Sequence, residues 1–152
     1  MSMYLNLFVR KNDEVVRLTD YSRNTALYRA FENIVPYEDV TIVTEEMLDR
    51  VWENLDKELY EVKRTIKLSK EKMKALRANA KTDEEWEWIT TISNTIDEFK
   101  NDKKNIKYFS NVVDFLKTIV DDMKYREGRN YLYAGIEVDI GTLEDAVREG
   151  YW

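Results

Sequence analysis

The sequence predicts an α+β fold: a small antiparallel or mixed sheet built from both chain ends, with a long antiparallel, coiled-coil-like helical hairpin inserted between them. Residues that interrupt regular structure are few, because the chain has one proline, Pro36, and four glycines that all lie near the C-terminus. Between them, two long stretches repeat apolar residues at the spacing of paired helices. We expect a single domain over 1–152, with the sheet and short helices in 1–43 and 128–152 and the hairpin in 44–127.

The N-terminal segment predicts a β-hairpin. Residues 3–9 are rich in β-forming side chains, and Leu5, Leu7 and Val9 alternate there with other residues. A polar turn over 11–14 separates this strand from a second apolar run over 15–18. Two such runs joined by a short polar turn form antiparallel neighbours.

A short helix and a third strand should follow the hairpin. We expect Ser22 or Asn24 to cap the helix and Pro36 to end it, since proline cannot continue a helix. The β-branched run over 40–43 then predicts a short strand. The helix is predicted from apolar residues at helical spacing, namely Ala26, Leu27, Ala30, Phe31 and Ile34.

Two seams of apolar residues at heptad spacing predict the long hairpin. Thr44 should cap the first helix, and Thr82 or Asp83 the second, after a polar linker over 79–85. So short a linker makes the helices antiparallel, and helices of about 35 to 45 residues would reach roughly 50 to 65 Å, so we expect the hairpin to protrude. The first seam is Leu48, Trp52, Leu55, Leu59, Val62, Ile66, Ser69, Met73 and Leu76; the second is Ile89, Ile92, Ile96, Phe99, Lys103, Ile106, Phe109, Val113, Leu116, Val120 and Met123.

The charges of the two predicted helices are complementary. Residues 57–81 hold nine Lys or Arg against three Glu, whereas residues 82–99 hold six acids and no base. Folding back at the linker sets these stretches side by side, so we expect ion pairs between them, each worth about 0.2 to 1 kcal/mol. Lys103 interrupts the second seam, and its ammonium either reaches solvent in a monomer or marks a polar layer in a homodimer.

The C-terminal segment predicts a further strand over 131–138 and a short capped helix over 141–147. This strand needs partners, and the nearest in composition are the N-terminal strands. Both chain ends are therefore expected to meet in one sheet.

The composition excludes several kinds of chemistry. The chain has no cysteine and no histidine, so disulfides, thiolate or imidazole metal sites and histidine-based catalysis are impossible. No apolar run approaches the roughly 20 residues that span a bilayer, and the first residues show no export signal, so we expect a cytoplasmic protein with no membrane contact. Asp121 with Asp122, and Glu137 with Asp139, are the nearest approach to a metal site, and neither pair has a third ligand. We expect no metal and no cofactor.

The start of the predicted short helix is the best small-ligand site. Arg23 stands there with Ser22, Asn24 and the aromatic Tyr28. A guanidinium beside the N–H groups of a helix start can receive a phosphate or carboxylate. Capping alone explains the same residues, so both interpretations stay open.

Aromatic residues exceed what a small core requires: the chain has ten tyrosines and four tryptophans. Trp86 and Trp88, two residues apart on a helix, cannot both face one seam, so they are candidates for a protein interface with the adjacent acids. Core packing or self-association is the alternative. The basic run over 57–81 could contact nucleic acid, but because the net charge is −6 and the acidic segment 82–99 is expected opposite this run, we expect no direct nucleic-acid binding. The candidate partner-binding residues are Trp86, Trp88, Glu84, Glu85, Tyr151 and Trp152.

The opening of the chain, with its strand MYLNLFVR and helix start YSRNT, resembles small uncharacterised proteins encoded by phages and prophages of Gram-positive bacteria. The resemblance covers about the first 40 residues. It implies an accessory phage protein, a group that includes inhibitors of host defence such as anti-CRISPR proteins. The implied partner is a host protein, for example a nucleic-acid-binding defence effector. No functional residue is carried over from the resemblance.

The composition and the aromatic residues predict a non-catalytic binding protein, and the resemblance implies an anti-CRISPR-like phage inhibitor that occludes the surface of a host defence protein. The alternative is a protein that sequesters a nucleotide or another small anion at Arg23, which a thermal shift with nucleotides would detect. A third possibility is a carboxylate metal-dependent enzyme acting on nucleic acid, which added Mg²⁺ or Mn²⁺ would reveal.

Overall fold

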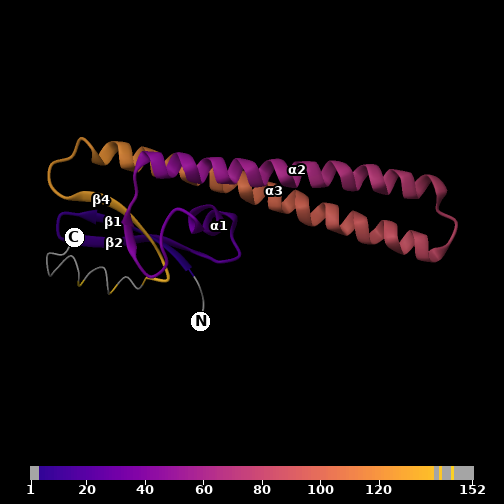
Figure 1. The fold of residues 1–152 in the computed structure, drawn as a ribbon, viewed down its shortest axis with the longest axis horizontal. Coiled ribbons are helices and arrows are strands. Elements are labelled where there is room, and N and C mark those ends of the chain that lie inside the picture. Colours follow the sequence, from indigo (N-terminus) through magenta and orange to yellow (C-terminus); the bar gives the residue numbers. More distant parts are fainter. Residues whose placement is uncertain (1–3, 139–140, 142–144, 146–152) are drawn as a thin grey trace. The chain divides into compact units, whose positions relative to one another are not determined.

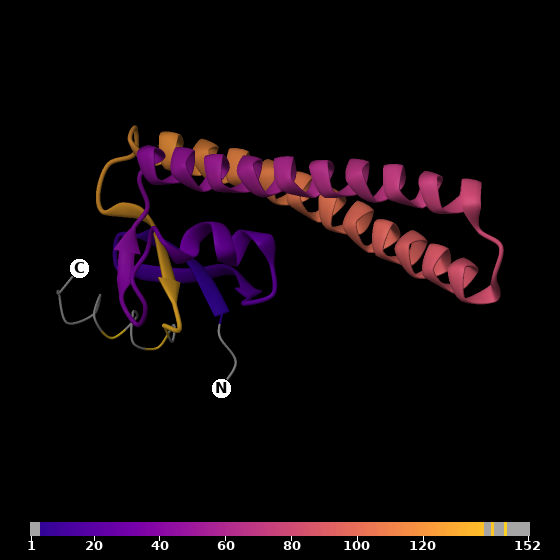
Figure 2. The ribbon, with the colours of Figure 1, turned by 45° about the vertical axis from the view of Figure 1, so that its right-hand side comes forward.

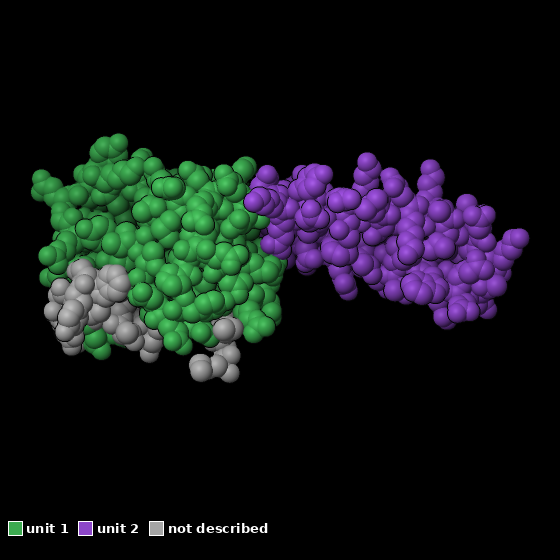
Figure 3. Space-filling model, in the orientation of Figure 1, with its two compact units in different colours: residues 1–55, 109–152 green, residues 56–108 purple. Residues whose placement is uncertain are grey.

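The computed structural model describes residues 4–138, 141 and 145, and it confirms the α+β fold (Figure 1). The chain divides into two compact units, residues 1–55 with 109–152 and residues 56–108 (Figure 3). The elements in chain order are β1 (Tyr4–Lys11), β2 (Glu14–Ser22), α1 (Ala26–Glu32), β3 (Val40–Ile42), α2 (Glu45–Asn79), α3 (Asp83–Met123) and β4 (Asn130–Ile136).

The sheet belongs to the first unit and joins both chain ends, as predicted. Its strand order is β2-β1-β4-β3, and every neighbouring pair is antiparallel. A loop of two residues, Asn12 and Asp13, connects β1 to β2, and Asn12 takes a positive φ of 55° that suits such a tight turn. The central strands β1 and β4 bring the N-terminal and C-terminal segments into direct register, with Leu7 opposite Ala134.

Both faces of β1 are buried. Leu5 and Leu7 are fully buried on one face, and alternation along the strand places Phe8 and Arg10 on the other. Phe8 packs there in a cluster with Val40, Tyr133 and Val138. The burial of Arg10 was not predicted, because the expected strand stopped at residue 9. Its Nε donates to the Asn12 carbonyl at 2.6 Å, and its Nη1 lies 3.5 Å from the Tyr133 hydroxyl.

The capping prediction for the short helix is wrong. Strand β2 runs to Ser22, so Ser22 is still part of the sheet, and the N-cap of α1 is Thr25. The Thr25 hydroxyl accepts from the Tyr28 backbone N–H at 3.3 Å and donates to the Ser22 carbonyl at 2.8 Å. The predicted end is also wrong, since the helix finishes at Glu32, before Pro36.

The two long helices begin where the sequence predicts, and Figures 1 and 2 draw them alongside each other as a hairpin. The Thr44 hydroxyl accepts from the Met47 N–H, and the Thr82 hydroxyl from the Glu85 N–H, each at 3.2 Å. Leu48 and Leu55 of the first seam are fully buried.

One seam assignment fails within the first unit. Trp52 is 40 % exposed, whereas Val51, which was not assigned to the seam, is fully buried. The reason is a second neighbour, since α2 also contacts α1 there through a hydrogen bond from Asn54 Nδ2 to the Ala30 carbonyl at 3.0 Å. An apolar stripe that meets two neighbours is wider than a strict heptad seam.

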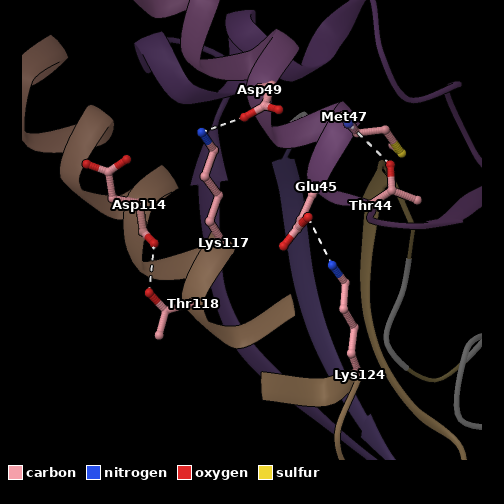
Figure 4. Close-up of polar contacts among 8 residues, drawn as sticks. All are labelled: Thr44, Glu45, Met47, Asp49, Asp114, Lys117, Thr118 and Lys124. Carbon is pink, nitrogen blue, oxygen red and sulfur yellow. Dashed lines mark hydrogen bonds and ion pairs between the residues drawn. The ribbon is translucent and has the colours of Figure 1, made fainter. Parts of the chain in front are cut away.

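Ion pairs between the helices form in the first unit (Figure 4). Lys117 pairs with Asp49 at 2.6 Å, and Lys124 pairs with Glu45 at 2.9 Å, which raises the pKa of Lys124. The predicted pairs between residues 57–81 and 82–99 are absent: none of the nine basic residues forms an ion pair with another residue of the described chain.

Of the two elements predicted near the C-terminus, the structure describes the strand and only two residues of the helix. Strand β4 begins at Asn130 and ends at Ile136, close to the predicted bounds. Of the predicted helix over 141–147, the structure describes only Gly141 and Asp145. Tyr151 and Trp152 lie outside the described residues.

Candidate partner-binding surface

The start of α3, in the second unit, is fixed by its cap. Thr82 accepts from the Glu85 N–H, and its hydroxyl donates to the Glu85 carboxylate at 3.1 Å. Asp83, Glu84 and Glu85 occupy the first turn, where the positive end of the helix dipole favours acids. Glu85 is half-buried and engaged in the cap, so the structure gives it a local structural role.

The two tryptophans of the next turn are both exposed, whereas their spacing excluded only that both face the seam. The Trp86 side chain is 49 % exposed and that of Trp88 is 57 % exposed. Residues two apart on an α-helix are separated by about 200° around its axis, so the indoles stand on opposite flanks of α3 with Glu87 between them. Ile89, one residue further, is buried in the seam and fixes this orientation.

Two open grooves run along this part of α3. One is lined by Glu84, Glu87, Trp88 and Thr91. The other is lined by Asp83, Trp86, Glu87, Thr90 and Thr91. Each groove therefore has one indole wall and at least two carboxylates. We call their combined lining the acidic–aromatic surface: Asp83, Glu84, Trp86, Glu87, Trp88, Thr90 and Thr91.

The hydrogen-bonding groups of this surface are mainly carboxylates. The Thr90 hydroxyl donates to the Trp86 carbonyl at 3.1 Å, and the Thr91 hydroxyl to the Glu87 carbonyl at 3.0 Å. Glu84 and Glu87 form no ion pair with any residue that the structure describes. The surface thus offers flat apolar rings and negative charge, and these groups can bind a partner by apolar contact and by ion pairing.

The structure does not bring all four residues of the predicted anion site to one surface. The Tyr28 side chain is 1 % exposed and belongs to the core, whereas Arg23 and Asn24 are exposed. The Ser22 carbonyl accepts from the Thr25 N–H at 3.0 Å, and Thr25 already occupies the Tyr28 N–H. The physical reason is the extra length of β2, which moves the helix start away from Ser22.

An apolar groove of about 390 Å³ in the first unit was missed by the sequence analysis. It lies between β2 and the end of α3, and Val16 and Leu18 are 59 % and 41 % exposed on its strand side. The predicted strand ended at residue 18, so the edge character of β2 was not recognised. The groove is lined by Val9, Lys11, Glu14, Val16, Leu18, Ile119, Asp122, Met123, Arg126 and Asn130.

Two of the four acids considered for a metal site, Asp121 and Asp122, lie beside basic side chains. Asp122 pairs with Arg126 at 2.7 Å, and Asp121 lies 3.9 Å from Lys124. Asp139 is outside the described residues, so the pair that it would form with Glu137 is not described. Over residues 4–138 with 141 and 145, the structure contains no group of three or more acidic side chains placed to hold a metal ion.

Comparison of the chain with protein-family models, with curated proteins and with solved structures finds no match. No helix in the described part combines the length and hydropathy that crossing a bilayer requires.

Proposed function

We propose that this chain is a non-catalytic binding protein whose acidic–aromatic surface docks on a basic surface of a partner protein. The observation that supports it is the pair of half-exposed indoles on either side of Glu87. Tryptophan is the residue most enriched among the energetic anchors of interfaces, where each ring fills a pocket on the partner. Because the two rings lie on opposite flanks of α3, a partner that contacts both must cover the helix face between them, which carries Glu87.

The chemistry of the surface indicates the kind of partner. Carboxylates at Asp83, Glu84 and Glu87 attract lysine and arginine and accelerate encounter with a basic surface. A partner arginine over an indole face would add about 0.5 to 2 kcal/mol by cation–π attraction. Nucleic-acid-binding proteins carry basic surfaces of this kind, because they must neutralise phosphates.

The finer proposal follows from the resemblance of the first 40 residues to phage and prophage proteins. On this proposal the chain is a phage-encoded, anti-CRISPR-like inhibitor that covers the basic surface of a host defence protein. Occlusion requires only contact, and it therefore suits a chain without histidine or cysteine.

The test starts by capturing a partner from a Gram-positive host lysate and then measures its affinity for variants of the chain. We expect Trp86→Ala with Trp88→Ala to weaken binding at least 30-fold, the effect of losing about 2 kcal/mol. The matched control is Tyr60→Ala, because Tyr60 is 65 % exposed on α2 of the same unit. This control should change the affinity less than threefold.

Two outcomes would overturn the proposal. Equal affinities for the tryptophan variant and the Tyr60 variant would remove the acidic–aromatic surface from the interface. Turnover of a substrate by the purified chain, lost with the same variants, would contradict a non-catalytic role.

A further inference from the structure

Five basic residues repeat along one face of α2 in the second unit. Their spacings are 4, 3, 4 and 3 residues, so they lie within about 80° of the helix circumference, next to the apolar seam. The first and last are 14 residues apart, or about 21 Å along the axis. All five side chains are exposed. We call this set the basic stripe: Lys63, Lys67, Lys70, Lys74 and Arg77.

Helix α3 adds basic residues to the same side. Ile66 marks the seam of α2, and Ile89 and Ile96 mark that of α3, since all three are buried. When two antiparallel helices pack seam against seam, the residue that follows a seam residue lies on the same side of the pair in both helices. By this rule Lys100, Lys104 and Lys107, which are also exposed, lie on the side of the basic stripe.

The acids of α3 mostly lie elsewhere. Glu84, Glu98 and Asp102 fall on the opposite side of the α3 seam, whereas Asp83 and Asp97 fall on the basic side. This separation keeps Glu84 and Glu98 away from the basic stripe, and it accounts in part for the absence of the predicted ion pairs between the helices. Neither the basic stripe nor the three lysines of α3 form ion pairs with other described residues.

We propose that this basic side binds the phosphate backbone of a duplex nucleic acid without reading its sequence. The positive charges of the basic stripe recur about every 5 Å along the axis of α2. A duplex carries one phosphate charge per about 1.7 Å of its axis, so the 21 Å length of the stripe covers roughly six base pairs. The expectation of no nucleic-acid binding rested in part on the net charge of −6. That charge is unevenly distributed, because residues 56–108 contain 13 Lys or Arg and 11 Asp or Glu.

A second copy of the chain fits this side less well. Two basic sides repel each other, so they cannot form a symmetric dimer. A basic side placed against the acidic side of another copy makes a head-to-tail contact. Such contacts add further copies in an open array unless the rotation between successive copies closes them into a ring. An external linear polyanion has neither difficulty.

The test is fluorescence anisotropy with a labelled 20-base-pair duplex of arbitrary sequence, using the full chain. With about four phosphates neutralised, the affinity should fall roughly 100-fold between 50 and 200 mM salt. We expect Lys67→Glu with Lys70→Glu and Lys74→Glu to weaken binding at 50 mM salt at least 30-fold. The control, Lys57→Glu with Arg64→Glu and Lys72→Glu, makes the same charge change off the basic side and should cost at most fivefold.

Other results would overturn the proposal. Absence of binding by the wild-type chain at 50 mM salt, or equal losses in the two triple variants, would exclude a localised duplex site. A salt-sensitive oligomer in sedimentation that the stripe variant abolishes would assign the basic side to self-association. If the glutamate variant loses helicity by circular dichroism, the corresponding glutamine variant, which removes charge without reversing it, replaces it.

Discussion

Phe8→Ala should lower the free energy of unfolding by about 3 to 5 kcal/mol, the largest effect expected of a single substitution in this chain. Phe8 is fully buried on the central strand β1, where it packs against Val40, Tyr133 and Val138. Truncation removes the whole buried ring and leaves a cavity beside Val40 and the segment that carries Tyr133 and Val138, both distant from Phe8 in the sequence. Urea unfolding followed by circular dichroism measures the change.

Phe115→Ala is the matched control, because this phenylalanine is 61 % exposed on α3. Its loss should change the unfolding free energy by about 0.5 kcal/mol or less. If Phe8→Ala and Phe115→Ala lowered the unfolding free energy equally, the sheet face that carries Phe8 would not be part of the core, contrary to what its burial indicates.

Gly128→Ala should destabilise the chain by about 1 to 3 kcal/mol. Gly128 has φ +92°, a conformation that alanine adopts only with strain. An added Cβ would also lie 2.1 Å from Asn12 Oδ1, which accepts from the Arg129 N–H at 3.2 Å. Displacing Asn12 would weaken the contact between the β1–β2 turn and the segment entering β4. Thermal unfolding provides the measurement.

Glu127→Ala is the control for Gly128, since it alters the neighbouring exposed residue without placing a side chain at a positive φ. We expect its melting temperature to stay within about 2 °C of the wild type. A Gly128→Ala variant as stable as this control would contradict the prediction, because it would show that Asn12 can move without a loss of stability.

Local geometry predicted only part of the tryptophan arrangement. Two residues at i and i+2 on a helix cannot both face one seam, whatever the rest of the fold does. That both Trp86 and Trp88 are exposed was decided by the orientation of α3, in which Ile89 is the residue buried in the seam. The surrounding grooves could not be predicted, because they also depend on the rotamers of Glu87 and Thr91.

The prediction of the helix cap failed because strand length is set by pairing rather than by local propensity. Residues 19–22 look like a loop in the sequence, yet β1 offers partners as far as Tyr4, which pairs with Ser22. The strand therefore continues, and the helix takes its cap from Thr25. Backbone hydrogen bonds to a distant segment outweighed a plausible local cap.

Local information in the chain sufficed for the class of the fold, the two long helices and the caps at Thr44 and Thr82, because period and capping act within a few residues. Only the tertiary structure decided that Val51 is buried and Trp52 is not, that Arg10 lies inside, and that no ion pair joins residues 57–81 to residues 82–99 in the described part of the chain. Each of these depends on how many neighbours an element meets and in what orientation, and those neighbours are distant in the sequence.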